Sequence, residues 1–298
     1  MISLPRRAPP SIATFSIVAY DPDDEAWGVA VASKFPAVGA VVPWAEAASG
    51  AVATQSYANT TYGPNGLRLM RQGQSAEHAL RSLLDQDPSQ NVRQAGMVDA
   101  HGQPATFTGA DCQPWAGGQT GSHFAAQGNL LAGPQVIQAM AAGFDSAHGD
   151  LAHRLLAALV AGDTAGGDRR GRQSAALLVV RAQAGYGGFN DRWIDYRVDD
   201  DPAPLERLSA LLKLHHLYFG KSAAEDKLPL EGMVARCLLS ILRRHAGFTG
   251  EAQDWLDPPA QQALREFIGR ENFEDRTDLE ALCIDRPVYE FLVERFGG

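Results

Sequence analysis

Three polar residues stand where the sequence could assemble an acyl-transfer site. Thr14 opens the run TFSIVAYD, Lys34 lies near the end of WGVAVASKF, and Asn129 ends FAAQGN. A threonine hydroxyl is a poor nucleophile at neutral pH. When the threonine is first in its chain, however, its own α-amine can act as the base, because the pKa of that amine is about 8. A nearby cation such as Lys34 lowers this pKa and favours the free base.

Asn129 could complete the chemistry of this site. Its side-chain amide, at the end of a strand, can donate to the oxyanion of a tetrahedral intermediate. The alternative is an ordinary turn asparagine that follows Gly128.

A glycine-flanked loop offers residues that could bind a substrate. The segment GGDRRGRQSAALL carries Asp168, Arg169, Arg172 and Gln173 ahead of a buried strand. Arginine binds a carboxylate at two points, while an aspartate can hold an ammonium group or orient an arginine. This loop suits an amino-acid-like or peptide-like substrate, although a solvated charged turn is the alternative. Gln55, at the end of GAVATQ, is a further candidate for lining the pocket.

A β-hairpin must bring Thr14 and Lys34 together. The segment DPDDEA has strong turn chemistry, so TFSIVAYD should pair with WGVAVASKF. If Asp21 opposes Trp27, Thr14 faces Lys34, whereas a four-residue loop pairs Thr14 with Ser33. The simplest alternative is that Thr14 only opens a strand and that Lys34 is a solvated strand end.

The wider pattern predicts two structural regions. Up to about residue 200 the chain is rich in Gly, Ala and Val, with short strand-like runs between helical stretches, which favours an α+β fold with layered sheets and helices. After VDDDPAP the sequence becomes helical. Residues 225–298 carry fifteen Asp and Glu against nine Lys and Arg, so this tail is acidic.

Composition excludes several classes of protein. The chain has 298 residues and a net charge of −9, which argues against a general nucleic-acid binder. Its three cysteines are far apart and lack zinc-site spacing, so we expect free thiols and no metal site. No apolar run reaches the roughly 18 residues of a membrane span, and no export signal follows Arg6 and Arg7. These features predict a cytoplasmic protein without membrane contact.

Several long motifs occur in order between residues 13 and 200: TFSIVAYDP, GVAVASKFPAVGAVVPWA, GAVATQSYAN, FAAQGNLLAGP and GGDRRGRQSAALLVVR. Together they resemble an uncharacterised bacterial family that is assigned to the Ntn-hydrolase superfamily. The resemblance implies a four-layer αββα sandwich over residues 14–220 and an amidohydrolase whose nucleophile is the first residue of the mature chain. Residues 226–298, with LREFIGRENFEDR and IDRPVYEFL, resemble a small all-α module described as peptidoglycan-binding.

The sequence departs from the family pattern at its start. Family members often begin Met-Thr-Phe-Ser, so that removal of the initiator methionine exposes the threonine that matches Thr14. Here MISLPRRAPPSIA precedes it, and residues 1–13 are expected to form a loose N-terminal arm. An amine held in a peptide bond has no basic lone pair. The chain is therefore cut before Thr14, or it starts further in, or the catalytic design is disabled.

The first functional hypothesis is an Ntn-type amidohydrolase that acts on a small amide or peptide-like substrate without a cofactor. Thr14 attacks after its exposure, Lys34 tunes its amine and Asn129 helps to hold the oxyanion, while Asp168 with Arg169 or Arg172 binds the substrate.

The second hypothesis is a non-catalytic protein that keeps the fold and binds cell-wall fragments or a protein partner. A third possibility is that Ser33 or another internal group does the chemistry in the uncut chain. An exposed apolar sheet edge also allows a homodimer.

Overall fold

The computed structural model describes residues 14–251 and 253–297. The predicted N-terminal arm, residues 1–13, lies outside the described residues. Backbone packing divides the chain into an N-terminal unit that ends at Leu212 and a C-terminal unit that begins at Lys213. Each unit has a hydrophobic core of its own.

A six-stranded antiparallel sheet forms the centre of the N-terminal unit, in the order β10-β9-β2-β1-β8-β7. Its strands in chain order are β1 (Thr14–Asp21), β2 (Ala26–Ser33), β7 (Gly117–Gly121), β8 (Phe124–Gly128), β9 (Ser174–Arg181) and β10 (Arg192–Val198). β1 and β2 are wholly or almost wholly buried along their lengths, because both faces of the sheet are covered.

A four-stranded antiparallel sheet packs against the six-stranded one, in the order β3-β4-β5-β6. It contains β3 (Pro43–Glu46), β4 (Gly50–Ser56), β5 (Arg93–Asp99) and β6 (Pro104–Thr108). Between the two sheets lies an apolar cluster that includes Val18, Val29 and Val98.

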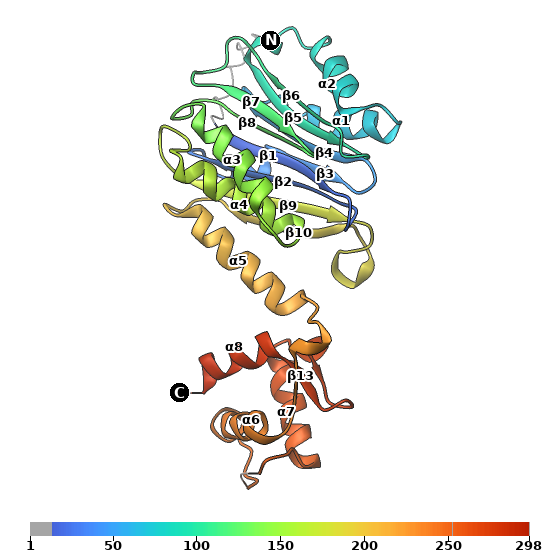
Figure 1. Ribbon diagram of the computed structural model, residues 1–298, viewed down its shortest axis with the longest axis vertical. Helices are drawn as coiled ribbons and strands as arrows, with labels where there is room; N and C mark the ends of the chain where they lie inside the picture. The colour runs from blue at the N-terminus through green and yellow to red at the C-terminus, as the bar shows by residue number, and fades with distance from the viewer. Residues whose placement is uncertain (1–13, 252, 298) are drawn as a thin grey trace, which may run out of the picture. The chain divides into compact units, whose positions relative to one another are not determined.

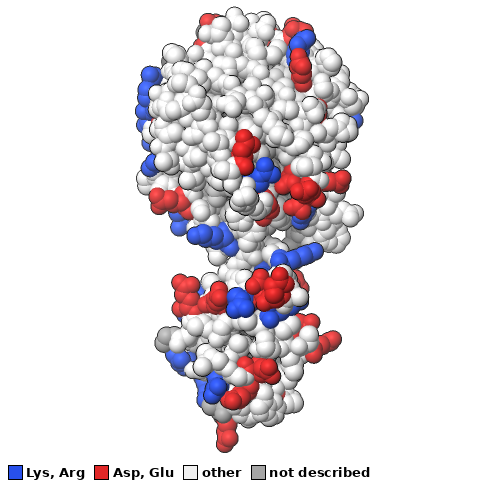
Figure 2. Space-filling model, viewed as in Figure 1, with Lys and Arg blue, Asp and Glu red and all other residues white. Residues whose placement is uncertain are grey.

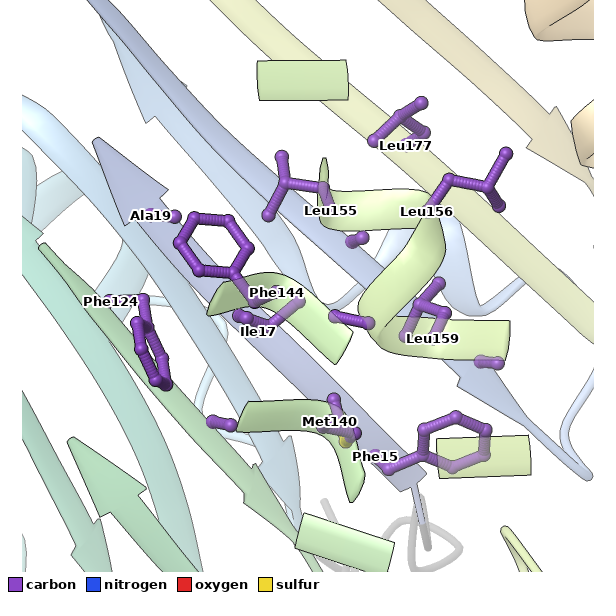
Figure 3. Close-up of a cluster of buried hydrophobic side chains, with 14 of the residues drawn as sticks. Phe15, Ile17, Ala19, Phe124, Met140, Phe144, Leu155, Leu156, Leu159 and Leu177 are labelled. Carbon is purple, nitrogen blue, oxygen red and sulfur yellow. The ribbon is translucent and has the colours of Figure 1, made fainter. Parts of the chain in front are cut away.

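Two pairs of helices cover the outer faces (Figure 1). α3 (Gln135–Ser146) and α4 (Leu151–Thr164) pack on the six-stranded sheet, and α1 (Tyr62–Arg71) and α2 (Ala76–Leu84) pack on the four-stranded sheet. Ser75 and Asp150 start α2 and α4, because each side chain accepts a hydrogen bond from the third residue after it. The core under α3 and α4 is dense and apolar (Figure 3).

The C-terminal unit is mainly helical. The division between the units falls within α5 (Pro204–Phe219), and α6 (Gly232–His245), α7 (Pro258–Arg270) and α8 (Arg286–Phe296) follow it. Three very short strands form a small antiparallel sheet: β11 (Lys227–Pro229), β12 (Thr277–Asp278) and β13 (Cys283–Asp285), in the order β11-β13-β12. A buried Arg276–Asp285 ion pair lies beside this sheet, and Arg276 also donates to two backbone carbonyl groups.

Short 3-10 helices connect several elements: η1 (Val38–Ala40), η2 (Gln90–Val92), η3 (Tyr186–Gly188), η4 (Ala224–Asp226) and η5 (Glu274–Arg276). Charged side chains are sparse over the face that carries α3 and α4, and they are dense on the visible face of the C-terminal unit (Figure 2). Within the described residues, no helix is long and apolar enough to cross a membrane. The three cysteines are free thiols, as predicted.

The prediction of a mixed fold of sheets and helices followed by a helical C-terminal region is confirmed, and the structure shows that the sheets are antiparallel. The prediction that this C-terminal region is entirely α-helical is wrong, because β11, β12 and β13 form a sheet there. These strands have only two or three residues each, too few to produce a recognisable alternating pattern in the sequence.

Candidate functional site

Thr14 is the first residue of β1 and is fully buried. Its Oγ1 donates to Oγ of Ser33, the residue that faces it on β2, over 3.1 Å. Its carbonyl oxygen accepts hydrogen bonds from the backbone N–H of Asn129 at 3.0 Å and from Nε2 of Gln55 at 3.3 Å. The backbone of Thr14 is therefore held by groups from β4 and from the end of β8.

The first of the two predicted hairpin registers is wrong, and the four-residue alternative is confirmed. Asp21 pairs with Ala26 rather than with Trp27, so Thr14 faces Ser33 and not Lys34. The loop closes in this way because Asp21 accepts the N–H of Asp23 and Glu25 adopts a positive φ of 45°.

Lys34 consequently lies one residue beyond β2 and is exposed. Its Nζ donates to the carbonyl oxygen of Arg172 at 3.3 Å, and its backbone N–H donates to Oδ2 of Asp168 at 3.0 Å. The structure thus joins Lys34 to the loop that contains Arg172, and not to the hydroxyl of Thr14.

A group of buried polar side chains fills the space between the two sheets next to Thr14. We call it the amide cluster, and it consists of Ser16, Gln55, Gln94, Gln127 and Asn129, all of which are fully buried. Ser16 Oγ donates to Gln55 Oε1 at 2.6 Å and accepts from Gln127 Nε2 at 2.7 Å. Gln94 Oε1 accepts from both Gln55 Nε2 and Asn129 Nδ2 at 2.9 Å. These bonds connect all five side chains.

Backbone carbonyl groups fix the direction of every hydrogen bond in the amide cluster. Gln94 Nε2 donates to the carbonyl oxygens of Gly117 and Gly128, which can only accept. Its Oε1 must therefore be the atom that faces Asn129, and the atom of Asn129 that faces it must be the nitrogen. Asn129 Oδ1 is then the remaining atom, and it is buried without a hydrogen-bond partner among residues 14–251 and 253–297.

This orientation bears on the predicted role of Asn129. An oxyanion needs a donor, and the side-chain nitrogen of Asn129 gives one of its two hydrogens to Gln94. The unpaired atom is an acceptor. Asn129 lies beside Thr14, and its oxygen, which has no partner among the described residues, could accept a further hydrogen bond.

The sequence interpretation missed Ser16 and Gln94 as parts of the site. Each is a lone polar residue in a strand whose neighbours are apolar, and this signal could have identified both. Gly96 is also required, because a Cβ at this position would lie 2.0 Å from Gln127 Oε1. The absent side chain at Gly96 makes room for the amide of Gln127.

Asp168 anchors the predicted substrate loop. Its side chain is only 1% exposed, and both carboxylate oxygens are occupied by Arg170 and by the backbone N–H of Lys34. The backbone N–H of Arg169 donates to Leu130, while its side chain is exposed and forms no salt bridge with residues 14–251 or 253–297. The carboxylate of Asp168 thus holds the loop to the end of β2.

Arg172 and Gln173 are paired with acids of neighbouring segments. Arg172 binds both oxygens of Asp163 at 2.9 Å, and this pairing raises the pKa of Arg172. Gln173 Nε2 donates to Asp200 at 3.0 Å. Arg172, Asp163 and Asp168 help to line a surface hollow of about 500 Å³.

The hollow extends toward the start of β1. Asp163, Gly171 and Arg172 line it and also line a much smaller space that Ser33 borders. Because Ser33 is hydrogen-bonded to Thr14, the predicted substrate loop and the predicted nucleophile are neighbours in the fold. Gln55 contacts Thr14 from the opposite side, within the amide cluster.

Comparisons with known proteins give two family matches. The model of a family of unknown function (DUF1028) matches residues 14–208, and the model of a peptidoglycan-binding domain (PG_binding_2) matches residues 218–292. A search of curated proteins finds no match.

A solved structure supports the first match. The chain is similar to a crystal structure of a protein from Silicibacter pomeroyi that is described by the same DUF1028 family. The two are 32% identical, with a TM-score of 0.63, and the alignment covers 68% of this chain and 89% of that one.

Proposed function

We propose, from the premise that this chain belongs to the family of unknown function DUF1028, that its N-terminal unit is an amidohydrolase of the N-terminal-nucleophile (Ntn) type. Its two stacked sheets between two helix pairs are compatible with the αββα sandwich of that superfamily. The observation that carries the proposal is the convergence of the amide cluster and Ser33 on Thr14, at the first residue of a central strand.

The free-energy cost of burying the polar side chains of the amide cluster supports a functional role for them. A buried polar group is unfavourable unless it is paired, and apolar residues would fill the space between the sheets without that requirement. The remainder of the interface between the sheets does use valines and alanines. The polar groups are confined to the end of the interface at which β1 begins.

In the proposed reaction, Thr14 Oγ1 attacks the carbonyl carbon of a small amide or peptide-like substrate. The α-amine of Thr14, once it is free, takes the hydroxyl proton and later delivers a proton to the leaving amine. Ser33 Oγ orients the attacking oxygen through the 3.1 Å hydrogen bond. Water then hydrolyses the acyl-enzyme.

The substrate would occupy the hollow beside loop 168–172. Arg172 and Asp163 border this hollow with opposite charges, so they suit a substrate that carries both a carboxylate and an ammonium group. Asp168 acts through the loop that it anchors, and the exposed side chains of Arg169 and Lys34 add positive charge near the entrance.

Exposure of Thr14 is the first test. We expect the intact mass of the purified protein to include a species that begins at Thr14. A chain prepared with residues 1–13 cleaved off should hydrolyse some members of a panel of amino-acid amides and cell-wall peptides.

A pair of Thr14 variants then tests the nucleophile. Thr14→Ala should reduce kcat by at least about 1000-fold without unfolding, while Thr14→Ser should keep measurable activity because it retains a hydroxyl. Full activity of Thr14→Ala would disprove the assignment. Activity that requires the uncut chain would instead indicate Ser33.

The C-terminal match supports a second candidate function, the binding of peptidoglycan fragments by residues 218–292. The exposed ring of Trp255 offers an apolar face for a sugar or peptide. We expect the full-length protein to co-sediment with purified peptidoglycan, and Trp255→Ala to weaken this binding more than Met233→Ala, a matched exposed site in the same unit. Equal binding by both variants would exclude Trp255 as a contact.

A further inference from the structure

In the part of the chain that the structure describes, Asn129 Oδ1 is an acceptor that is fully buried and has no hydrogen-bond partner. The hydrogen bonds of the amide cluster allow only one orientation of the Asn129 side-chain amide. Reversing the Asn129 amide would place its oxygen against Gln94 Oε1, and Gln94 cannot reverse because its Nε2 is held by two backbone carbonyl groups. No donor in the described part of the chain therefore reaches the buried oxygen of Asn129.

Strand geometry places the nitrogen of Thr14 on the side of Asn129. In an antiparallel ladder, the N–H and C=O groups of one residue point toward the same neighbouring strand. The C=O group of Thr14 accepts from the N–H of Asn129 at 3.0 Å, so the nitrogen of Thr14 faces the end of β8 as well.

The two side chains also share one face of the sheet. Gln127 and Asn129 are two residues apart, as are Thr14 and Ser16, and Gln127 contacts Ser16 between the sheets. Thr14 and Asn129 thus lie opposite each other on the inner face, where directly opposed residues have Cβ atoms about 5 Å apart.

Cleavage before Thr14 would create new donors at this point. An internal threonine has one hydrogen on its backbone nitrogen, whereas a terminal ammonium group has three. The additional hydrogens arise on the atom that faces the end of β8, where Asn129 carries a side-chain oxygen that has no partner among the described residues.

We propose that Asn129 is the positioning residue for the free α-amine of Thr14: Oδ1 accepts one N–H of the amine and thereby directs its lone pair toward Oγ1. This inference rests on the proposed exposure of Thr14, and it assigns Asn129 an accepting role in place of the donor role that its residue type suggested. Gln94 holds the Asn129 amide in this orientation, and Gln127 lies further along the cluster.

The α-amine itself provides the test, without any substrate. Protein labelled with ¹⁵N-threonine is cleaved to begin at Thr14, and the pKa of its α-amine is measured by NMR titration. The uncut protein identifies the signal, because its Thr14 nitrogen does not titrate. Asn129→Asp places a carboxylate next to the amine and should raise this pKa by about 1 unit or more. Asn129→Leu removes the acceptor and should lower it.

Gln127→Met is the matched control. It also removes a buried amide from the cluster, but from the part that contacts Ser16, so it should leave the amine pKa unchanged. An amine pKa that is the same in the wild type and in Asn129→Asp would overturn the proposal, as would equal shifts in Asn129→Leu and Gln127→Met.

The outcome is separate from that of the proposed function. If the amine pKa responds to Asn129 and no amide is hydrolysed, the amidohydrolase assignment fails and the role of Asn129 stands. If hydrolysis occurs and Asn129→Leu changes only the KM, with no change in the amine pKa, Oδ1 contacts the substrate and the positioning role is wrong.

Discussion

The two faces of β1 show how one strand can serve two purposes. Phe15, Ile17 and Ala19 point toward α3 and α4 and join an apolar core (Figure 3). The alternate residues Thr14 and Ser16 point toward the other sheet and join hydrogen bonds. Both sets are fully or almost fully buried, so burial alone does not distinguish a packing position from a candidate functional one.

The difference teaches how each face is stabilised. The helix-facing side depends on apolar area and close packing, so a loss of side-chain volume leaves a cavity and lowers stability. The amide cluster depends on complementary donors and acceptors, so the removal of one partner leaves others unpaired. Variants of similar size should therefore have different consequences on the two faces.

The largest effect should follow a deletion on the helix-facing side. We expect Ile17→Ala to lower the free energy of unfolding by about 3 to 4 kcal/mol, because Ile17 is completely buried and leaves a cavity. Urea unfolding measures the change. Val160→Ala on the exposed surface of α4 is the control, with an expected change below about 0.5 kcal/mol. A cost below about 1 kcal/mol for Ile17→Ala would contradict this account.

A second variant should show that the polar face cannot be replaced by apolar volume. Gln94→Leu is expected to lower the free energy of unfolding by about 2 to 3 kcal/mol. It removes the hydrogen-bond partner of the Asn129 amide and of the carbonyl groups of Gly117 and Gly128. Gln86→Leu, at an exposed position, should be nearly neutral. If Gln94→Leu stabilises the protein, the hydrogen bonds of the amide cluster do not limit which side chains can fill this space.

A third variant tests the contact between the sheets at the amide cluster. Gly96→Ala should cost about 2 kcal/mol, since its Cβ would meet Gln127 Oε1 at 2.0 Å. Gly269→Ala, in α7, meets no atom within 4 Å and should be neutral or slightly stabilising. Equal unfolding midpoints for Gly96→Ala and the wild type would show that the sheets separate easily at this point.

The smallest expected effect is a change of stability with pH, which a buried charged group produces and a neutral polar group does not. Burial raises the pKa of Asp87, but hydrogen bonds from Arg93, Asn59 and the backbone of Ser89 outweigh this and hold the pKa well below its ordinary value. Because the folded state has the lower pKa, the contribution of Asp87 to stability is complete above about pH 4 and is lost as the pH falls further.

Asp87→Asn should accordingly cost about 1 kcal/mol at pH 7 and progressively less below pH 4. The cost of Gln94→Leu should not change over this range, because the amide cluster contains no titratable side chain. Urea unfolding at several pH values measures both. A cost for Asp87→Asn that is constant with pH would refute the assignment.

The sequence predicted the mixed fold of helices and sheets, the helical C-terminal region and the buried hairpin that starts at Thr14. It left the hairpin register open, because the turn chemistry of DPDDEA does not determine whether the loop has four or five residues. It also left the choice among the arginines undetermined, since the pairing of Arg170 with Asp168 and of Arg172 with Asp163 depends on packing between distant segments.

The amide cluster could not be predicted from the sequence, because it forms only where the two sheets are in contact. Gln94 comes from β5, Gln55 from β4 and Gln127 from β8, and only their packing shows which amide group faces which. A lone polar residue in an apolar strand could have indicated burial of a polar group. The polarity of Asn129, however, follows from backbone carbonyl groups that no sequence pattern locates.

The hydrogen bonds of the amide cluster each have one fixed direction, and this limits how a proton can move near Thr14. Amide groups do not exchange protons readily, and the Ser16 hydroxyl is hydrogen-bonded to two amides. The amide cluster therefore offers no route for a proton on the inner side of Thr14. In the proposed reaction the α-amine of Thr14 takes the hydroxyl proton and returns a proton to the leaving group, so no proton has to cross the amide cluster. Substrate and water would instead reach Thr14 from the side of Ser33, where the surface hollow and the smaller space beside it lie.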